Sequence, residues 1–134
     1  MKNISKICTS IEQSKKLIEL GIDVKTADMY YSHEFVNSAG DYYKLNIASE
    51  GYFDDEEILG SNIPAWSLSA LIDLMPHEIT IKDDGTPYRL LVTHNLVHYP
   101  RLTTMWPSIY SVETNTTLDA AFEVICELLK DKII

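Results

Sequence analysis

Apolar residues recur with a helical period in a segment near the start of the chain, residues 10–20. Thr9 and Glu12 have the spacing of a capping box, in which two side chains satisfy backbone N–H groups of the first turn. Gly21 follows, and glycine commonly ends a helix. The pattern therefore predicts an amphipathic helix over 10–20, followed by a single polar turn at 23–28.

Two later segments show the same period. Residues 68–75 have apolar positions at i, i+3, i+4 and i+7, with Ser67 as the cap and Pro76 as the stop. The last segment begins at Thr116 or Thr117 and runs to about residue 130. We expect the buried face of this last helix to consist of Leu118, Ala121, Phe122, Ile125, Leu128 and Leu129.

Between the first two predicted helices the apolar period changes to two, which is typical of half-buried strands. Residues 29–35 alternate in this way, and residues 43–47 do so after a turn at 37–41. The pattern predicts a hairpin. Residues 50–62 have no steady period, so we expect a solvated loop or a short frayed helix there.

A second hairpin is predicted after Pro76. Ile79 and Ile81 alternate with polar neighbours, residues 83–87 form a turn, and residues 88–93 are rich in strand formers. A further strand is expected at 108–114. The order of elements is then α-ββ-α-βββ-α. This order predicts an α+β fold with a single domain over residues 1–134, in which an antiparallel sheet of about five strands packs against three helices.

The composition agrees with one folded domain. The chain has 134 residues, of which 46% are hydrophobic, so a core can form without disulfides or a metal. Its formal net charge is −9, and a negative field repels nucleic-acid phosphates and anionic membranes. No apolar run has the length of a secretory signal or of a membrane span. We expect a cytoplasmic protein that binds neither nucleic acid nor membrane.

Three segments resemble a known family. They are Cys8–Gly21 (CTSIEQSKKLIELG), Ile63–Leu71 (IPAWSLSAL) and Asp119–Glu123 (DAAFE). In these segments the chain resembles a family of small proteins, without an assigned function, from anaerobic gut bacteria and their phages or mobile elements. The middle segment is the most specific, because Pro, Trp and Ser at that spacing are uncommon together. The resemblance implies an intracellular accessory protein rather than a housekeeping enzyme, and it assigns no functional residue.

Metal ligands are sparse in the sequence. His94 and His98 would share one face of a helix, but their neighbours favour strand or loop. On a strand the two histidines would lie ~13 Å apart, which two ligands of one zinc ion cannot span. The acidic run 54–57 lacks the alternating ligands of a calcium loop and is expected to be solvated. The sequence therefore predicts no metal and no cofactor.

Candidate nucleophiles are two thiols, which should be reduced in the cytoplasm. Cys126 lies beside the apolar stripe of the last predicted helix, where a cysteine behaves as a small hydrophobe. Cys8 lies near a helix N-terminus, which can lower the pKa of a thiol. Neither is accompanied by a recognisable base, so no catalytic residue is assigned.

Candidate binding residues come from an aromatic and proline-rich stretch with weak periodicity. They are Tyr99, Arg101 and Trp106. Tyr, Trp and Arg dominate interface hot spots, and the neighbouring prolines limit strand pairing. An alternative is that Trp106 closes one end of the core. Trp66, next to a helix cap, is expected to pack onto the core.

Three hypotheses about function follow. The first is a non-enzymatic cytoplasmic interaction or assembly module of phage or mobile-element type, whose partner is another protein or a second copy of itself. The second is a small enzyme built from dispersed residues, for which His33, His94, His98, Cys8 and carboxylates are the material. The third is an acidic inhibitor that mimics DNA, although eleven cations are interspersed among its acids.

Overall fold

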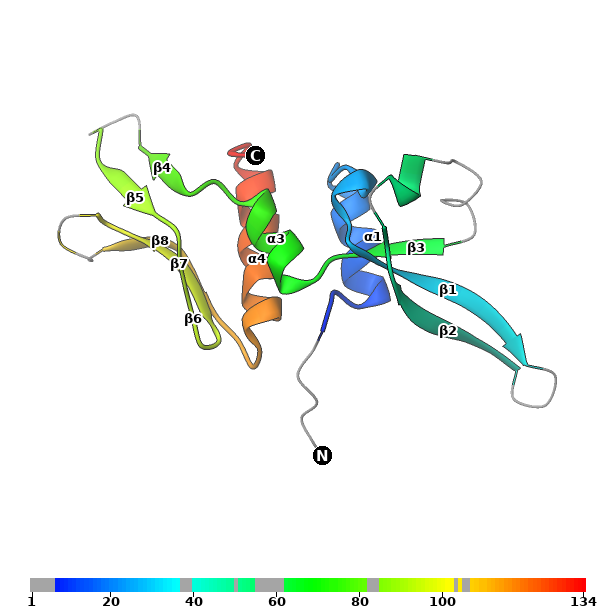
Figure 1. Ribbon diagram of the computed structural model, residues 1–134. Helices are drawn as coiled ribbons and strands as arrows, with labels where there is room; N and C mark the ends of the chain where they lie inside the picture. Colours follow the sequence, from blue (N-terminus) through cyan, green and yellow to red (C-terminus); the bar gives the residue numbers. More distant parts are fainter. Residues whose placement is uncertain are drawn as a thin grey trace. The chain divides into compact units, whose positions relative to one another are not determined.

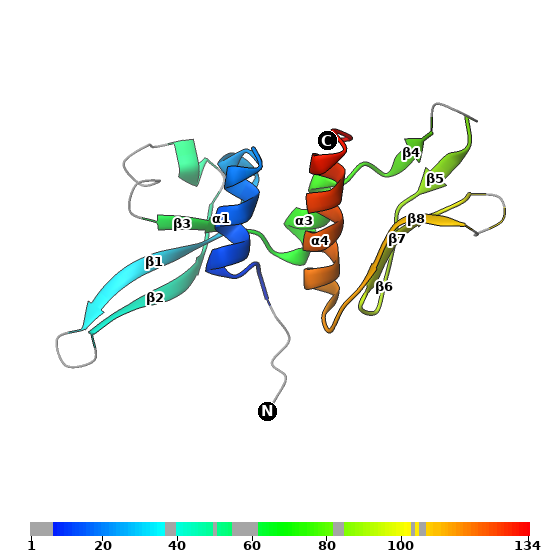
Figure 2. The same cartoon turned by 180° about the vertical axis from the view of Figure 1, so that it is seen from behind.

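The computed structural model describes residues 7–36, 40–49, 51–54, 62–81, 85–102, 104 and 107–134. These residues form two compact units, an N-terminal unit over 7–70 and a C-terminal unit over 71–134 (Figures 1 and 2). Both contain helix and antiparallel sheet, so the predicted α+β class is confirmed. The single domain over 1–134 stays a prediction.

The N-terminal unit is built on a three-stranded antiparallel sheet with the order β2-β1-β3 (Figure 1). The strands are β1 (Met29–Val36), β2 (Gly40–Ile47) and β3 (Asn62–Ala65). Tyr31 of β1 lies opposite Leu45 on one side and Ile63 on the other. The hairpin predicted from the period-two pattern is confirmed, and β3 completes the sheet.

Helix α1 (Ile11–Glu19) packs against β3. Its N-cap is Ser10, whose side chain accepts a hydrogen bond from the Gln13 N–H, while the Gln13 side chain accepts one from the Ser10 N–H. The predicted cap of Thr9 with Glu12 was therefore wrong by one residue. Gly21 follows the helix with φ +102°, a conformation that glycine adopts without strain.

Thr9 is fully buried and ties α1 to the end of β3. Its hydroxyl lies 2.8 Å from the Ser14 hydroxyl and accepts a hydrogen bond from the Trp66 N–H at 3.1 Å. The Thr9 N–H donates in turn to the Trp66 carbonyl at 2.9 Å. Trp66 is also fully buried, and its indole N–H donates to Thr26 at 2.9 Å. The prediction that Trp66 packs onto the core is confirmed.

Two short 3₁₀ helices complete the described part of the N-terminal unit, η1 (Val24–Thr26) and η2 (Tyr52–Asp54). Tyr52 stacks on Tyr30 of β1, with ring centroids 4.3 Å apart. A hydrogen bond with Tyr30, together with burial, raises the pKa of Tyr52 to about 12. The turn predicted at 23–28 is confirmed, whereas most of the acidic run 54–57 lies outside the described residues.

Helix α3 (Leu68–Leu74) begins in the N-terminal unit and ends in the C-terminal unit. Ser67 caps it as predicted, because its hydroxyl accepts a hydrogen bond from the Ala70 N–H at 3.2 Å. The carboxylate of Asp28 accepts hydrogen bonds from both the N–H and the hydroxyl of Ser67. This cap fixes the start of the helix against the beginning of β1.

The C-terminal unit holds two small antiparallel sheets, β4-β5 and β6-β7-β8. Their strands are β4 (Glu78–Thr80), β5 (Pro87–Arg89), β6 (Leu91–Thr93), β7 (Leu96–Pro100) and β8 (Ser108–Glu113). The eight strands in the described residues thus form three small sheets instead of one sheet of about five strands. Strand β7 was not predicted, because its apolar residues and proline do not alternate regularly.

The predicted strand over 88–93 is divided into β5 and β6 at Leu90. The Leu90 N–H donates to the His77 carbonyl at 2.8 Å and so extends the pairing of β5 with β4. On the side away from β4, Tyr88 of β5 forms an isolated bridge with Arg101. This bridge continues the antiparallel register of β6 with β7, in which Leu91 lies opposite His98. This stretch therefore contacts both β4 and the end of β7, an arrangement that a period-two pattern does not reveal.

Helix α4 (Thr117–Lys130) packs on β7 and β8 (Figures 1 and 2). The sequence left the start of this helix open between Thr116 and Thr117. The structure has Thr116 as the N-cap, which accepts a hydrogen bond from the Asp119 N–H at 3.1 Å. Leu129 is only half-buried, contrary to prediction. The residues of α4 that are buried are Leu118, Ala120, Ala121, Phe122, Val124, Ile125 and Leu128.

Candidate binding site in the C-terminal unit

Arg101 lies where β7 passes into the following segment. Its N–H donates to the Pro107 carbonyl at 3.2 Å, and its guanidinium donates to the Thr86 hydroxyl at 3.0 Å. The neighbouring Leu102 N–H donates to the Pro87 carbonyl at 3.1 Å. Pro107 therefore fixes the backbone of Arg101, and Thr86 fixes its guanidinium. The side chain of Arg101 is half-buried.

A cavity of about 130 Å³ opens beside Arg101. Its lining contains both arginines of the chain, Arg89 and Arg101, although the two are twelve positions apart in the sequence. The remaining lining is apolar and includes Leu102, whose side chain is 41% exposed. We call the lining residues the arginine site: Arg89, Leu90, Leu91, Pro100, Arg101 and Leu102.

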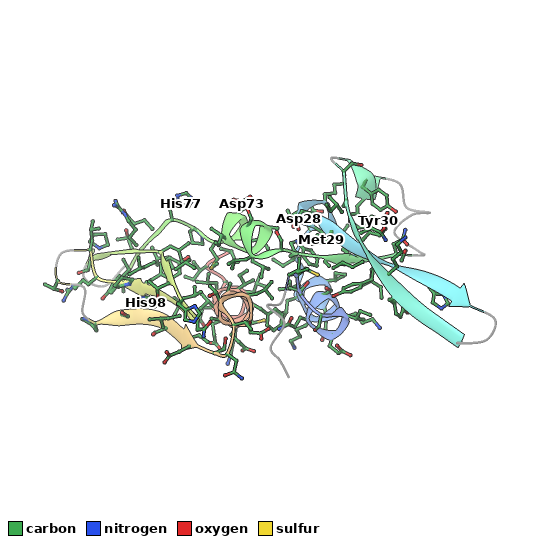
Figure 3. All side chains as sticks on the ribbon, turned by 60° about the horizontal axis from the view of Figure 1, so that its bottom comes forward. Asp28, Met29, Tyr30, Asp73, His77 and His98 are labelled. Carbon is green, nitrogen blue, oxygen red and sulfur yellow. The ribbon has the colours of Figure 1, made fainter. Side chains whose placement is uncertain are left out.

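A second cavity, of about 440 Å³, shares Arg89 and Leu90 with the arginine site. It is also lined by His77 and Glu78, and the His77 side chain extends away from the body of the C-terminal unit (Figure 3). Arg89 lies opposite Glu78 in the β4-β5 register, with 3.5 Å between the guanidinium and the carboxylate. Exposed ion pairs are worth about 0–1 kcal/mol, so Glu78 competes only weakly for Arg89.

Of the sequence-predicted binding residues, Arg101 lines the arginine site. Tyr99 is fully buried, and its hydroxyl donates to the Pro76 carbonyl at 2.7 Å. Burial raises the pKa of the Tyr99 phenol. Trp106 lies outside the described residues. Tyr99 therefore supports the strand that carries Arg101, and a contact between Trp106 and a partner stays a prediction.

Arg89 was missed in the sequence because it lies in a strand with no motif around it. The signal that could have found it is compositional. A chain with eleven cations and a charge of −9 holds only two arginines, and arginine pairs with carboxylates better than lysine does. The tertiary contacts of β5 with residues 101–102, among them the pairing of Tyr88 with Arg101, bring the two arginines together.

The two histidines considered as metal ligands, His94 and His98, lie in the β6-β7 hairpin. His98 lies on β7 (Figure 3), and its Nδ1 is 2.9 Å from the Ser108 hydroxyl. Burial lowers the pKa of His98, which favours a neutral ring at pH 7. His94 lies in the turn between β6 and β7. In the part of the chain that the structure describes, no three His, Cys, Asp or Glu residues gather as a metal site would require.

Cys8, the thiol near the start of α1, is buried. Its sulfur lies 3.5 Å from the Tyr31 hydroxyl, and that hydroxyl donates to the Thr9 carbonyl at 2.8 Å. Burial, followed by the hydrogen bond with Cys8, raises the pKa of Tyr31. This cluster joins β1 to the chain just before α1.

The arginine site combines cationic groups with an apolar floor. A cavity of about 130 Å³ accommodates a branched aliphatic side chain, and a guanidinium can pair with a carboxylate in a bidentate fashion. A ligand that carries both groups side by side fits this arrangement.

Comparison with known proteins adds no relative: no family model, no curated protein and no solved structure matches the chain. Among the described residues, no helix combines the length and the apolarity that crossing a bilayer requires.

Proposed function

We propose that the protein is a non-enzymatic, cytoplasmic protein-interaction module of phage or mobile-element type. In this proposal, the arginine site binds a partner segment in which one carboxylate stands next to an aliphatic side chain. The observation that carries the proposal is that both arginines of an acidic chain line one largely apolar cavity.

The chemistry of the site favours a protein partner. Arginine is enriched at interface hot spots, where a charge-assisted contact is combined with apolar burial. The exposed Leu102 offers apolar area directly beside Arg101. A segment with a single carboxylate suits the site better than a polyacidic segment, because each further negative charge meets the field of a chain with net charge −9.

Selection from a displayed library of random peptides tests this proposal. We expect the selected peptides to share an Asp or Glu adjacent to Leu, Ile or Val. Arg101→Gln and Arg89→Gln should each weaken binding of a selected peptide by about tenfold, the effect of losing a contact worth about 1.4 kcal/mol. Glu78→Gln should strengthen binding only slightly, because Glu78 competes weakly for Arg89.

Lys130→Gln is the matched control for charge. It removes one cation from the exposed end of α4 and should leave peptide binding unchanged. Selected peptides without a carboxylate, or peptides that bind the two arginine variants as tightly as the original chain, would count against the proposal.

A further inference from the structure

Strand β2 forms one edge of the N-terminal sheet, since in the described residues it pairs only with β1 (Figure 1). The Ala48 N–H donates to the Asp28 carbonyl at 2.9 Å and continues the β1-β2 register. In an antiparallel pair, residues that are hydrogen-bonded to the partner strand alternate with residues whose N–H and C=O groups point away from that strand. The N–H and C=O groups of Tyr43, Leu45 and Ile47 therefore point away from β1, toward the edge.

The same three residues form an apolar row on one face of the sheet. Their side chains share a face because the residues are two apart. Ile47 is 81% exposed and Tyr43 is 47% exposed, while Leu45 is half-buried. On β1 they lie opposite Met29, Tyr31 and His33. The edge thus presents pairing groups and apolar side chains from the same positions, which is a surface for another strand.

We propose that a second copy of this chain occupies the edge, with the two β2 strands antiparallel about a two-fold axis at Leu45. In this register Leu45 lies opposite Leu45 of the other copy, and Tyr43 lies opposite Ile47. Each of the three apolar residues gains an apolar cross-strand partner, and each such pair exchanges two backbone hydrogen bonds. The two sheets become one continuous sheet with a shared apolar row.

The position of Lys44 favours this register over the neighbouring one, which has its axis at Lys44. With the axis at Leu45, the exposed Lys44 lies directly opposite the uncharged Asn46 of the other copy. With the axis at Lys44, two lysines would face each other directly, which is destabilising. That register would also place Ile47 opposite position 41, which holds an aspartate. Of these two registers, the one with the axis at Leu45 is therefore the more favourable.

The charge of the chain sets the conditions for association. Two copies with net charge −9 repel each other, and salt screens this repulsion, so the dimer should strengthen as the salt concentration rises. One strand pair buries less than the ~800 Å² per partner that is typical of stable interfaces. We therefore expect a reversible dimer that depends on concentration.

Sedimentation velocity over a concentration series tests the proposal. In about 0.3 M salt, the sedimentation coefficient should rise with concentration from that of a monomer toward that of a dimer. Leu45→Lys places two like charges at the axis and should abolish the rise. Ser69→Lys adds the same charge at an exposed position of α3 and should leave the rise intact. Circular dichroism verifies that both variants are folded.

Cysteine cross-linking in a Cys126→Ala background tests the register. Leu45→Cys should form a disulfide-linked dimer under mild oxidation, because hydrogen-bonded antiparallel neighbours have Cα atoms ~5.5 Å apart. In a dimer of Tyr43→Cys, the introduced cysteines of the two copies lie roughly 14 Å apart, so no disulfide should form between them. A monomer at every concentration, or a dimer unaffected by Leu45→Lys, would overturn the proposal. Linking of Tyr43→Cys as fast as of Leu45→Cys would overturn the register.

Discussion

Replacing Trp66 by alanine is expected to lower the free energy of unfolding of the N-terminal unit by about 3–5 kcal/mol, as for other buried tryptophans. Trp66 is fully buried, so its removal leaves a cavity where the indole packs. The loss also removes the indole hydrogen bond to Thr26. Urea denaturation followed by circular dichroism measures the change.

Trp66→Phe is the matched control for this substitution. It keeps most of the apolar volume and loses the indole hydrogen bond, whose acceptor Thr26 is exposed and can bond to water. We expect a cost of about 1 kcal/mol from the lost hydrogen bond together with a smaller packing defect. Equal stability of Trp66→Ala and the original chain would show that Trp66 does not hold this unit together.

Tyr99→Ala should destabilise the C-terminal unit by a similar amount, about 3–5 kcal/mol. The ring is fully buried, and it makes an edge-on contact with Tyr110 at a centroid separation of 6.3 Å. Tyr99→Phe should cost about 1 kcal/mol, because only the hydrogen bond to the Pro76 carbonyl is lost. Urea denaturation of the two variants gives both values.

The same pair of variants separates a core role from a contact role for Tyr99. If Tyr99 is a buried supporting residue, Tyr99→Phe should bind a selected peptide as tightly as the original chain does. If Tyr99→Phe kept full stability but lost peptide binding, Tyr99 would be a contact residue, and its supporting role in the core would be wrong.

The helices could be predicted closely because their signals are local. The cap at Ser67, the start of the last helix at Thr116 or Thr117 and the stop at Pro76 depend on a few neighbouring residues, and the structure confirms them. The error at Thr9 has a tertiary cause. Thr9 has a suitable side chain for a cap, but its hydroxyl is used by the Trp66 N–H, and Ser10 caps α1 instead.

The division of the strands could not be predicted, because it depends on which neighbours compete for the same backbone groups. Residues 88–93 read as one strand, yet the Leu90 N–H pairs with His77 while Tyr88 pairs with Arg101. The arginine site is a consequence of that pairing. The sequence therefore identified Arg101 but offered no reason to connect it with Arg89.

The two proposed surfaces lie in different units and can be tested separately. Leu45→Lys changes β2 in the N-terminal unit and should leave peptide binding unaffected. Arg101→Gln changes the C-terminal unit and should leave the sedimentation behaviour unaffected. The resemblance to phage-associated proteins stays a prediction and supports neither surface.

We propose, as the central claim, that Arg89 and Arg101 bind a carboxylate that stands next to an aliphatic group. The most direct test is an NMR titration of the isotope-labelled chain with isovalerate, and with isovaleramide as the uncharged control of the same shape. We expect saturable shifts of the Leu90, Leu91 and Leu102 methyl groups and of the Arg89 and Arg101 side-chain N–H signals, with at least fivefold weaker binding of the amide. Equal binding of the acid and the amide, or saturable shifts confined to other residues, would contradict this proposal.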